Sequence, residues 1–527
     1  MNRNLGLCSG ILQKERGASP SLLRLIITQN FSNRWHSLSR LCQKACTGWK
    51  ACATGNFLSA GISLLLALLW FSGCTMAPEY TRPAAPVPAD WPRGPAYKEI
   101  KSTPETPAAA DLKWREFFAD ERMQRVIETA LKNNRDLRVA ALNVDRARGL
   151  YRIQRAELLP RAETKLIATK QRVRLSSQPG LVTLEEYGVN LGVSAWEIDF
   201  FGRIRSLSQR ALEEYFATEQ ARRSAQILLI SEVANAYLTL AADRENLKLA
   251  HSTLETQQAA YNLIKRRFEV GLAPELDLRQ VQTRVDSARV DVARYTELAA
   301  KDENALNLLA GSPVAAGLLP QELSVVKPLS DVSPGTTSEV LLRRPDILQA
   351  EHVLKGANAN IGAARAAFFP RISLTTAIGT ASGDLSGLFK SGSYVWNYAP
   401  QIILPIFDAR TWAGLTVSKV DREIAVAQYE KTIQGAFREV ADTLARRGTL
   451  EDQMEAQQSL LDATAKTYRL SNARYEKGID IYLNVLDAQR SLYSAQQGLI
   501  AVRLAKLANQ VRLYAVLGGG GEVGAPL

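Results

Sequence analysis

One stretch of this chain constrains its fold more than any other: residues 202–270 contain no proline and no interior glycine. Ala, Leu, Glu, Gln and Arg, which favour helices, are abundant throughout it. A helix of this length extends about 100 Å at ~1.5 Å per residue. Because no ordinary globular core accommodates such a helix, we expect a coiled coil or an extended helical tube.

A second proline-free stretch covers residues 409–477, and the sequence at its end repeats the end of the first. Arg-Phe-Glu-Val-Gly-Leu ends at Leu272, and Arg-Tyr-Glu-Lys-Gly-Ile ends at Ile479, 207 positions further on. Each phrase has helical patterns on both sides and a glycine, Gly271 or Gly478, where a hairpin of antiparallel helices needs its turn. We call these turns the two tips. The repeat predicts two similar halves, each with a short helix, two strands, a long helix, a tip and a second short helix.

The period of the pattern changes to two between the short and the long helix of each half. In the first half a helix is expected over 121–159, and residues 187–196 then alternate as in a half-buried strand, with 163–175 as its partner. In the second half the strands are expected at 371–380 and 394–404. The apolar face comprises Tyr187, Val189, Leu191, Val193 and Ala195, with Trp396, Tyr398, Ile402 and Leu404 in the last strand, and the opposite face comprises Gly188, Asn190, Gly192, Ser194 and Trp196.

Four such strands cannot stand alone in a membrane, because their two open edges would leave backbone groups unpaired in hydrocarbon. Closure requires two, three or more copies of the chain, and three copies would give twelve strands around a water-filled lumen. The face with Gly188 and Asn190 suits the wall of a lumen, and Trp396 and Tyr398 suit an interfacial girdle.

The N-terminal region has the pattern of a secretory signal. The apolar run 57–70 is too short to span a membrane but fits the h-region of a signal peptide. It ends at Phe71-Ser72-Gly73-Cys74, which resembles a bacterial lipobox, so we expect N-acyl and S-diacylglycerol groups on Cys74 and no other cofactor. An ordinary signal peptide or an uncleaved anchor is the alternative. The proline-rich stretch 75–107 that follows predicts an extended strap.

The composition excludes several classes of function. The net charge is +12, but residues 1–73 carry eight basic side chains against one acidic, which leaves about +5 and no basic stripe for nucleic acid. No cysteine follows Cys74, and His36, His251 and His352 are isolated, so we expect no metal site. The sequence has no phosphate-binding glycine loop, nucleophile elbow or metal-ligand spacing, and we predict neither catalytic residues nor an enzyme.

These features divide the chain at its changes of composition and period. The predicted parts are an N-terminal extension with the signal peptide (1–73), the strap (74–110), the first repeat (111–312), a linker (313–338), the second repeat (339–517) and a flexible tail (518–527).

Several segments resemble a known family in their order along the duplicated scaffold. They are Cys74 with its strap, Ala399-Pro400, Leu404-Pro405-Ile406-Phe407-Asp408, 424–431, 437–442 and Leu486-Asp487-Ala488-Gln489-Arg490. Over about residues 74–520 the chain resembles the outer membrane factors, the TolC-like efflux channels, and especially the lipoprotein branch that includes OprM and NodT.

The resemblance implies an α+β membrane protein of Gram-negative bacteria. Three chains would form a twelve-stranded β-barrel in the outer membrane, and their coiled-coil helices would form a periplasmic α-barrel. It also implies partners: a periplasmic adaptor protein and an inner-membrane pump, often of the resistance-nodulation-division (RND) type. Such an assembly would export drugs or other small toxic compounds.

In that family the second tip carries the closed gate of the channel. By motif match the gate residues here are Asp487 and Arg490, with Leu483 one turn earlier and Asn484 where some members have a second aspartate; Asp277 of the first tip is the expected substitute. Three Asp487 carboxylates near a narrow axis would repel one another unless paired with Arg490 or hydrated. The alternative is an ordinary surface pair, worth about a few tenths of a kcal/mol.

The residues of the two turns resemble the adaptor-docking turns of the family. They are Gly271, Leu272, Gly478 and Ile479, and the alternative is that they only close helical hairpins. Two other functions stay open at this point. A channel of the same fold could serve type I protein secretion, although the lipoprotein branch favours efflux, and a periplasmic coiled-coil scaffold or adaptor would lack the alternating strands.

Overall fold

The structure, a computed structural model, describes residues 75–98, 109, 111–174, 180–327, 329–330, 332–335 and 337–521. All of them belong to one unit that starts at Cys74. The predicted signal peptide, Cys74 itself and the end of the predicted tail (522–527) lie outside the described residues.

The first half has helices on both sides of its strands. Its helices are α4 (Glu121–Asn133), α5 (Arg135–Ala156), α6 (Arg203–Glu269) and α7 (Glu275–Ala310). The prediction of one continuous helix over 121–159 is wrong, because Asn134 interrupts it. The Asn134 side chain accepts a hydrogen bond from the backbone N–H of Leu137 (2.9 Å), which caps α5, and its amide donates to the carbonyl of Leu309 (3.0 Å).

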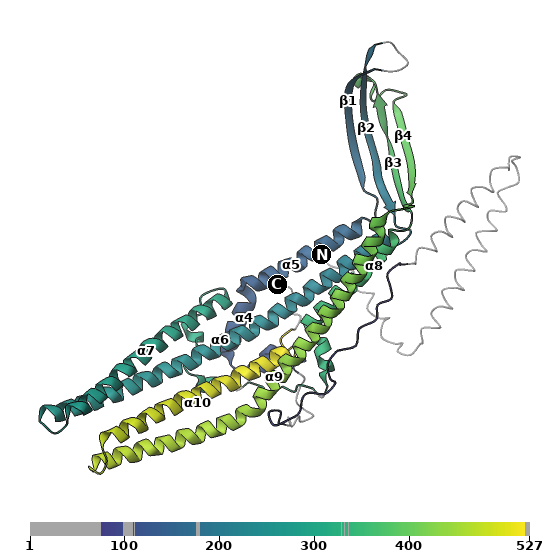
Figure 1. Ribbon diagram of the computed structural model, residues 1–527. Helices are drawn as coiled ribbons and strands as arrows, with labels where there is room; N and C mark the ends of the chain where they lie inside the picture. The colour runs from purple at the N-terminus through teal and green to yellow at the C-terminus, as the bar shows by residue number, and fades with distance from the viewer. Residues whose placement is uncertain are drawn as a thin grey trace, which may run out of the picture. The chain divides into compact units, whose positions relative to one another are not determined.

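The second half repeats this arrangement with α8 (Pro345–Ala366), α9 (Ala409–Glu476) and α10 (Tyr482–Val516). The shorter helices α5 and α7 both pack along α6, α8 packs between α6 and α9, and α10 packs on α9 and α6 (Figure 1). One stretch of α6 is apolar enough to cross a membrane, yet 67% of it is buried against its neighbours, so α6 is the core of the helical layer. One edge of this layer is α9, and the other, at the end near the strands, is α5.

Four antiparallel strands form one sheet in the order β1-β2-β3-β4, at the opposite end of the helices from the tips (Figure 1). The strands are β1 (Ala162–Arg174), β2 (Leu181–Ile198), β3 (Arg371–Ser382) and β4 (Tyr394–Ile403). The register pairs Leu166 with Val189 and sets Ile378 between Leu191 and Trp396. Paired residues point to the same side of a sheet, so all four strands share one apolar face, as the alternation predicts.

β2 contains a bulge that the alternating pattern did not predict. Ser194 and Ala195 together stand opposite Thr375 of β3, Ala195 has a φ of 48°, and its N–H donates to the Thr375 hydroxyl (3.1 Å). The prediction of strict alternation is therefore wrong at the end of 187–196. The extra residue moves Trp196 to the apolar face, where it pairs with Leu374.

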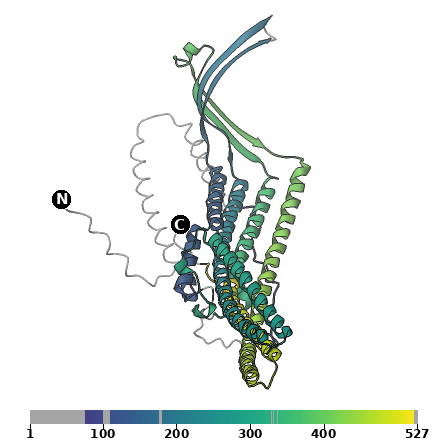
Figure 2. The same ribbon diagram turned by 90° about the vertical axis from the view of Figure 1, so that its left-hand side faces the viewer.

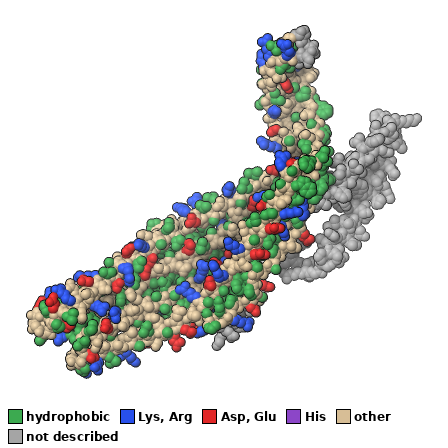
Figure 3. Space-filling model, viewed as in Figure 1, with side chains coloured by type: hydrophobic (Ala, Val, Ile, Leu, Met, Phe, Trp, Pro, Cys, Tyr) green, Lys and Arg blue, Asp and Glu red, His purple; other side chains and the backbone are tan. Residues whose placement is uncertain are grey.

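The other face of the sheet is lined by small and polar residues, and the strands curve strongly (Figure 2). A Cβ atom at Gly192 would overlap the backbone of Thr376 and Ala377, and one at Gly379 would overlap that of Val189. Glycine at these positions lets β2 and β3 approach closely on the inside of the curve. In the view of Figure 3, hydrophobic side chains gather where the sheet meets the helices, and Lys and Arg side chains lie at the far end of the sheet as well as along the helices.

A belt of short segments covers one face of the helical layer. It comprises the strap (75–98), α3 (Trp114–Phe117), α4, and the 3-10 helices η1 (Ala316–Leu318), η2 (Leu323–Val325) and η3 (Ser338–Arg343). The Phe117 ring stacks on the Tyr514 ring of α10 with centroids 4.1 Å apart, and the Tyr514 hydroxyl donates to the carbonyl of Leu112 (2.7 Å). These aromatic contacts fix the belt to the helices.

Two predicted connecting segments are packed parts of this belt. The predicted linker 313–338 buries Leu319 and Leu323 almost completely. The predicted flexible tail is corrected for its first residues, because Gly519 and Gly520 are buried between α6 and α10. Gln226 of α6 donates to the carbonyl of Gly520 (2.9 Å), and a Cβ atom at Gly519 would overlap the Tyr514 ring. The glycines therefore allow close packing at this place, although composition alone suggested a flexible tail.

Candidate functional site

The two tips have the same backbone turn. Gly271 and Gly478 have φ values of 78° and 70°, and both lie in open space, so the backbone conformation and not packing requires glycine. The next N–H donates back to the helix in each tip: Leu272 to Arg267 O (2.7 Å) and Ile479 to Arg474 O (2.9 Å). This pattern ends each helix cleanly. The Leu272 and Ile479 side chains project from these turns, 70% and 59% exposed.

The side chains around the turns differ between the tips. In the second tip Arg474 forms an ion pair with Asp480 (2.5 Å), and the hydrogen bond from Arg474 lowers the pKa of Asp480. In the first tip Arg267 instead crosses to the second tip and donates to the Tyr475 hydroxyl (2.6 Å). The Tyr475 ring lies 4.9 Å from Tyr482, and burial raises the pKa of Tyr482 to about 12.

The predicted gate residues share the exposed side of α10 next to the second tip. The Asp487 carboxylate lies 3.6 Å from Arg490, as the spacing predicts, and 3.9 Å from Arg284 of α7. Leu483 and Asn484 are also exposed, one turn earlier. Asp487 therefore lies between arginines from both hairpins.

Asp277, the predicted substitute for a second acidic residue, lies apart from this cluster. It occupies the first turn of α7, where the helix dipole favours an acidic side chain. Among the described ion pairs none joins Asp277 to Asp487, Arg490 or Arg284. The structure thus brings Asp487 and Arg490 together and leaves Asp277 in the other tip.

Arg284 was not predicted from the sequence. It lies on the return helix of the first hairpin, and only the side-by-side packing of α7 and α10 brings it to Asp487. The sequence signal that could have found it is the repeat. At the offset of 207 residues Arg284 corresponds to Ser491, which is the neighbour of the predicted gate residue Arg490.

Further polar contacts continue from this cluster along α7 and α10. The Tyr493 hydroxyl donates to Asp291 (3.3 Å), and burial raises the pKa of Tyr493. Gln497 donates to the Tyr295 hydroxyl (3.0 Å). Polar contacts of this kind can be exchanged for water at small net cost, so this seam can separate more easily than an apolar one.

The start of the strap lies near the base of the sheet. Arg365, in the last turn of α8 before β3, donates to the carbonyl of Met76 (3.1 Å). Asn358 donates to the carbonyl of Pro78 (2.8 Å), and Arg82 forms an ion pair with the buried Glu351 (2.7 Å). The residues that follow Cys74 are therefore held at the end of the helices from which the strands emerge.

The family model described as "Outer membrane efflux protein" matches residues 126–312 and 336–519 of the chain. The chain belongs to this family. The match covers both halves of the repeat, including both long helices, both pairs of strands and both tips.

Relatives and solved structures agree with this assignment. The probable efflux pump outer membrane protein TtgC of Pseudomonas putida is 50% identical over 87% of this chain and 95% of its own length. Outer membrane protein OprJ of Pseudomonas aeruginosa is 41% identical over 89% and 97%. The open state of the Neisseria gonorrhoeae MtrE outer membrane channel has a TM-score of 0.76 and 38% identity, over 85% of this chain and 98% of that one.

Membership of this family assigns a role to the helices and to the strands of the chain. The chain is an outer-membrane channel component of a tripartite efflux system, and its helices extend from the outer membrane into the periplasm. Its four strands are one third of a trimeric β-barrel, and its long helices contribute to a periplasmic α-barrel. The open edges of β1 and β4 pair with neighbouring copies in such a barrel, as the sequence predicts. The family is one of channels and not of enzymes.

Proposed function

We propose that Asp487, Arg490 and Arg284 form the gate that closes the periplasmic end of the channel. The observation that carries this proposal is the position of Asp487 between an arginine of its own helix and one of the other hairpin. In a trimer three such clusters meet near the axis, where unpaired carboxylates would repel one another. The arginines neutralise this charge and tie the two hairpins together. Leu483 and Asn484 extend the constriction, and Asp277 adds an acidic group from the first tip.

A double-mutant cycle in planar bilayers tests the gate. Asp487→Ala removes the shared partner of both arginines and raises the conductance of the purified mature trimer several-fold. Arg284→Gln raises it less, because Arg490 still holds Asp487. The double variant conducts no more than Asp487→Ala alone, since both substitutions break the same contact. Equal conductance in the wild-type and Asp487→Ala channels would contradict the proposal.

We infer that the tips bind a periplasmic adaptor protein, which links the channel to an inner-membrane pump of the RND type. The support is the exposure of Leu272 and Ile479, two apolar side chains that project from rigid turns around Gly271 and Gly478. Such side chains are typical anchors for a partner. Leu272→Asp with Ile479→Asp should abolish efflux in cells while trimer formation and conductance in bilayers persist. Unimpaired efflux by this variant would refute adaptor binding at the tips.

The class of compound that this assembly exports is inferred from the relatives of the chain. Relatives of this chain are named for toluene, solvent and antibiotic efflux pumps. We propose that this channel likewise exports drugs or other small toxic compounds, in preference to the secretion of a protein. Deletion of the gene should increase susceptibility to several such compounds, and the intact gene should restore resistance. Loss of a secreted protein without any change of susceptibility would favour the secretion function.

We also propose that Cys74 carries the lipid anchor. The support is the lipobox-like sequence together with the strap contacts of Met76 and Pro78, which hold the start of the strap at the base of the sheet. A lipid on Cys74 would there reach the inner leaflet of the outer membrane. Radioactive palmitate should label the wild-type protein and not the Cys74→Ser variant. Label that survives this change would exclude Cys74 as the acylated residue.

A further inference from the structure

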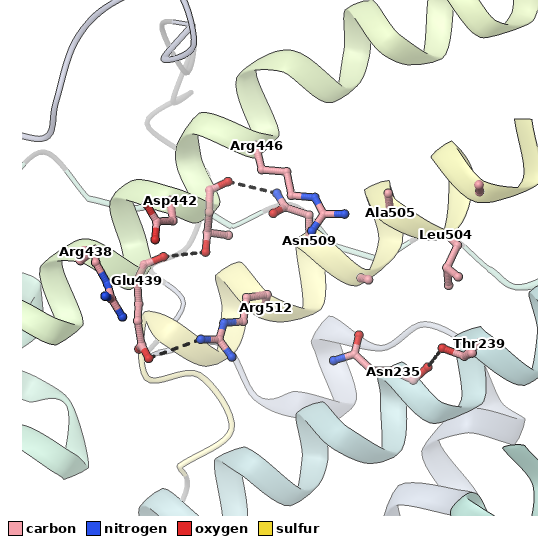
Figure 4. Close-up of a pocket in the computed structure, with 13 residues that line it drawn as sticks. Asn235, Thr239, Arg438, Glu439, Asp442, Arg446, Leu504, Ala505, Asn509 and Arg512 are labelled. Carbon is pink, nitrogen blue, oxygen red and sulfur yellow. Dashed lines mark hydrogen bonds and ion pairs between the residues drawn. The ribbon is translucent and has the colours of Figure 1, made fainter. Parts of the chain in front are cut away.

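A groove lies away from the tips, between α6, α9 and α10. It has a volume of about 690 Å³. Arg438, Asp442 and Arg446 of α9 line one side (Figure 4). Ala501, Ala505 and Ala508 of α10 line the apolar part of the groove, which we call its floor.

The groove opens on the face of the helical layer that the belt leaves free. On α9 the belt contacts other positions: Phe437 stacks on Trp91 of the strap (5.3 Å), and Arg447 donates to Val332 O (3.1 Å). Arg438, Asp442 and Arg446, spaced four residues apart, lie on the side of α9 turned away from these contacts. On α10 Tyr514 likewise points into the belt.

This free face is the inside of the tube when three copies close. The strap leads back to the N-terminus, which must run outside the tube to reach the membrane, so the belt is outside and the groove faces the lumen. This step rests on the proposed lipid anchor and on the trimeric channel.

Three arginines and two carboxylates line the groove, and their pairing is uneven. Glu439 is shared by Arg512 (3.3 Å) and Arg344 (3.1 Å). In the part of the chain that the structure describes, neither Arg438 nor Arg446 forms an ion pair or a side-chain hydrogen bond, and Figure 4 draws none for them. Glu439 and Asp442 both lie between them in sequence, but Glu439 is taken up by Arg512 and Arg344, so three arginines against two carboxylates leave the groove with an excess positive charge.

Three copies of the groove would place six such arginines around the lumen. Rings of arginine favour anions in pores, and clefts lined by one charge raise the local concentration of the opposite charge. A guanidinium also binds carboxylate or sulfonate oxygens in a two-pronged geometry. The alanine floor next to the arginines offers an apolar surface to the rest of the same ligand.

We propose that this groove is a lumen binding site for amphiphilic organic anions. The anionic head group binds between Arg438 and Arg446, and the hydrocarbon part lies on Ala501, Ala505 and Ala508. The site lies on the route of every exported compound, so it raises the local concentration of anions relative to cations of the same size. It is separate from the gate, which lies next to the tips.

Block of the channel current by octanesulfonate tests this site. The mature trimer is placed in planar bilayers, and the concentration for half-maximal block is measured for octanesulfonate and for octyltrimethylammonium. Arg438→Gln with Arg446→Gln should weaken the block by octanesulfonate about threefold or more, because six charges leave the lumen. It should leave the block by octyltrimethylammonium unchanged or strengthen it. Arg438→Lys with Arg446→Lys keeps the charge and should retain most of the block.

The matched control removes two charges from the belt, Arg93→Gln with Arg125→Gln, and should leave the block by octanesulfonate unchanged. Equal block in the wild-type and the Arg438→Gln/Arg446→Gln channels would overturn the site while the channel stands. An equal loss of block in the control would also overturn it, because the effect would then reflect overall charge. If the trimer conducts no current even with Asp487→Ala in the gate, the channel on which this site rests is refuted, and the site falls with it.

Discussion

The arginine before each tip, Arg267 in the first hairpin and Arg474 in the second, occupies the same position of the repeat but makes a different contact. Arg474 pairs within its own tip with Asp480, and the first tip has Ala273 at that position. Arg267 therefore has no acidic neighbour at this position and binds the Tyr475 hydroxyl of the second tip. The same backbone turn is thus closed internally in one hairpin and tied to its neighbour in the other.

The difference extends into the helices. Asp243 of α6 and Asp302 of α7 face each other in the first hairpin, and the corresponding residues of the second are Leu450 and Asn509. Burial raises the pKa of both aspartates, that of Asp302 to about 6, and the charge of Asp243 contributes to the latter. Asn509 instead donates to the carbonyl of Thr443 (3.2 Å). At this position the second hairpin satisfies its polar group internally, whereas the first keeps an electrostatic conflict between two carboxyl groups.

Replacement of the tip glycines tests whether the two backbones are equivalent. Gly271→Ala and Gly478→Ala each force a side chain into the left-handed region, at a cost of about 1–2 kcal/mol. We expect both to speed hydrogen exchange of the next amide, Leu272 or Ile479, by a similar factor. Exchange that changes in only one tip would show that the turns are not equivalent.

Asp302→Asn tests the electrostatic conflict in the first hairpin. The pKa of Asp302 in the folded protein lies above its ordinary value of 3.8, so the folded state holds this proton more tightly than the unfolded chain. The resulting stabilisation is complete below about pH 3.8 and is lost as the pH rises through about 6. At pH 7.5 the variant should therefore be the more stable, by about 1 kcal/mol after allowance for solvent screening.

Thermal melts of the detergent-solubilised trimer at pH 4 and pH 7.5 measure this effect. The difference between Asp302→Asn and wild type should be present at pH 7.5 and nearly absent at pH 4. Asn509→Asp, at the corresponding position of the second hairpin, provides the reverse comparison and should destabilise the protein at pH 7.5. A melting difference for Asp302→Asn that is the same at both pH values would contradict the assignment.

Tyr475→Phe tests the link between the tips and has the smallest expected effect on stability. It removes the hydroxyl that accepts from Arg267 but keeps the ring, so the loss is about 0.5–1 kcal/mol. Hydrogen exchange should increase in both tips, because each loses its neighbour. Asp480→Ala, which breaks only the internal pair of the second tip, is the control and should affect that tip alone. Confinement of the Tyr475→Phe effect to the second tip would refute the link.

The regular elements could be predicted from the sequence because their signals are local. Proline-free stretches set the bounds of α6 and α9 closely, and alternation located the strands. The break between two helices at Asn134 was not predicted, because asparagine is tolerated within a helical pattern. It ends a helix only where its side chain binds a backbone group, and the sequence pattern does not show that contact. The bulge at Ser194 and Ala195 depends on the register with β3, which no single strand reveals.

The candidate site could be predicted only in part, because some of its contacts are local in sequence and others join different hairpins. Asp487 and Arg490 lie three residues apart on one helix, so their contact follows from local geometry. Arg284 reaches Asp487 through the packing of α7 against α10, and Arg267 reaches Tyr475 across the two tips. Such long-range contacts depend on how the hairpins pack, and the repeat alone does not specify this packing.

The conductance of two matched variants tests most directly the central claim that the second tip carries the gate. Gln280 occupies in the first tip the position that Asp487 occupies in the second. In planar bilayers Asp487→Ala should raise the conductance of the trimer several-fold, and Gln280→Ala should leave it at the wild-type value. An equal rise in both variants, or a rise in Gln280→Ala alone, would contradict the account.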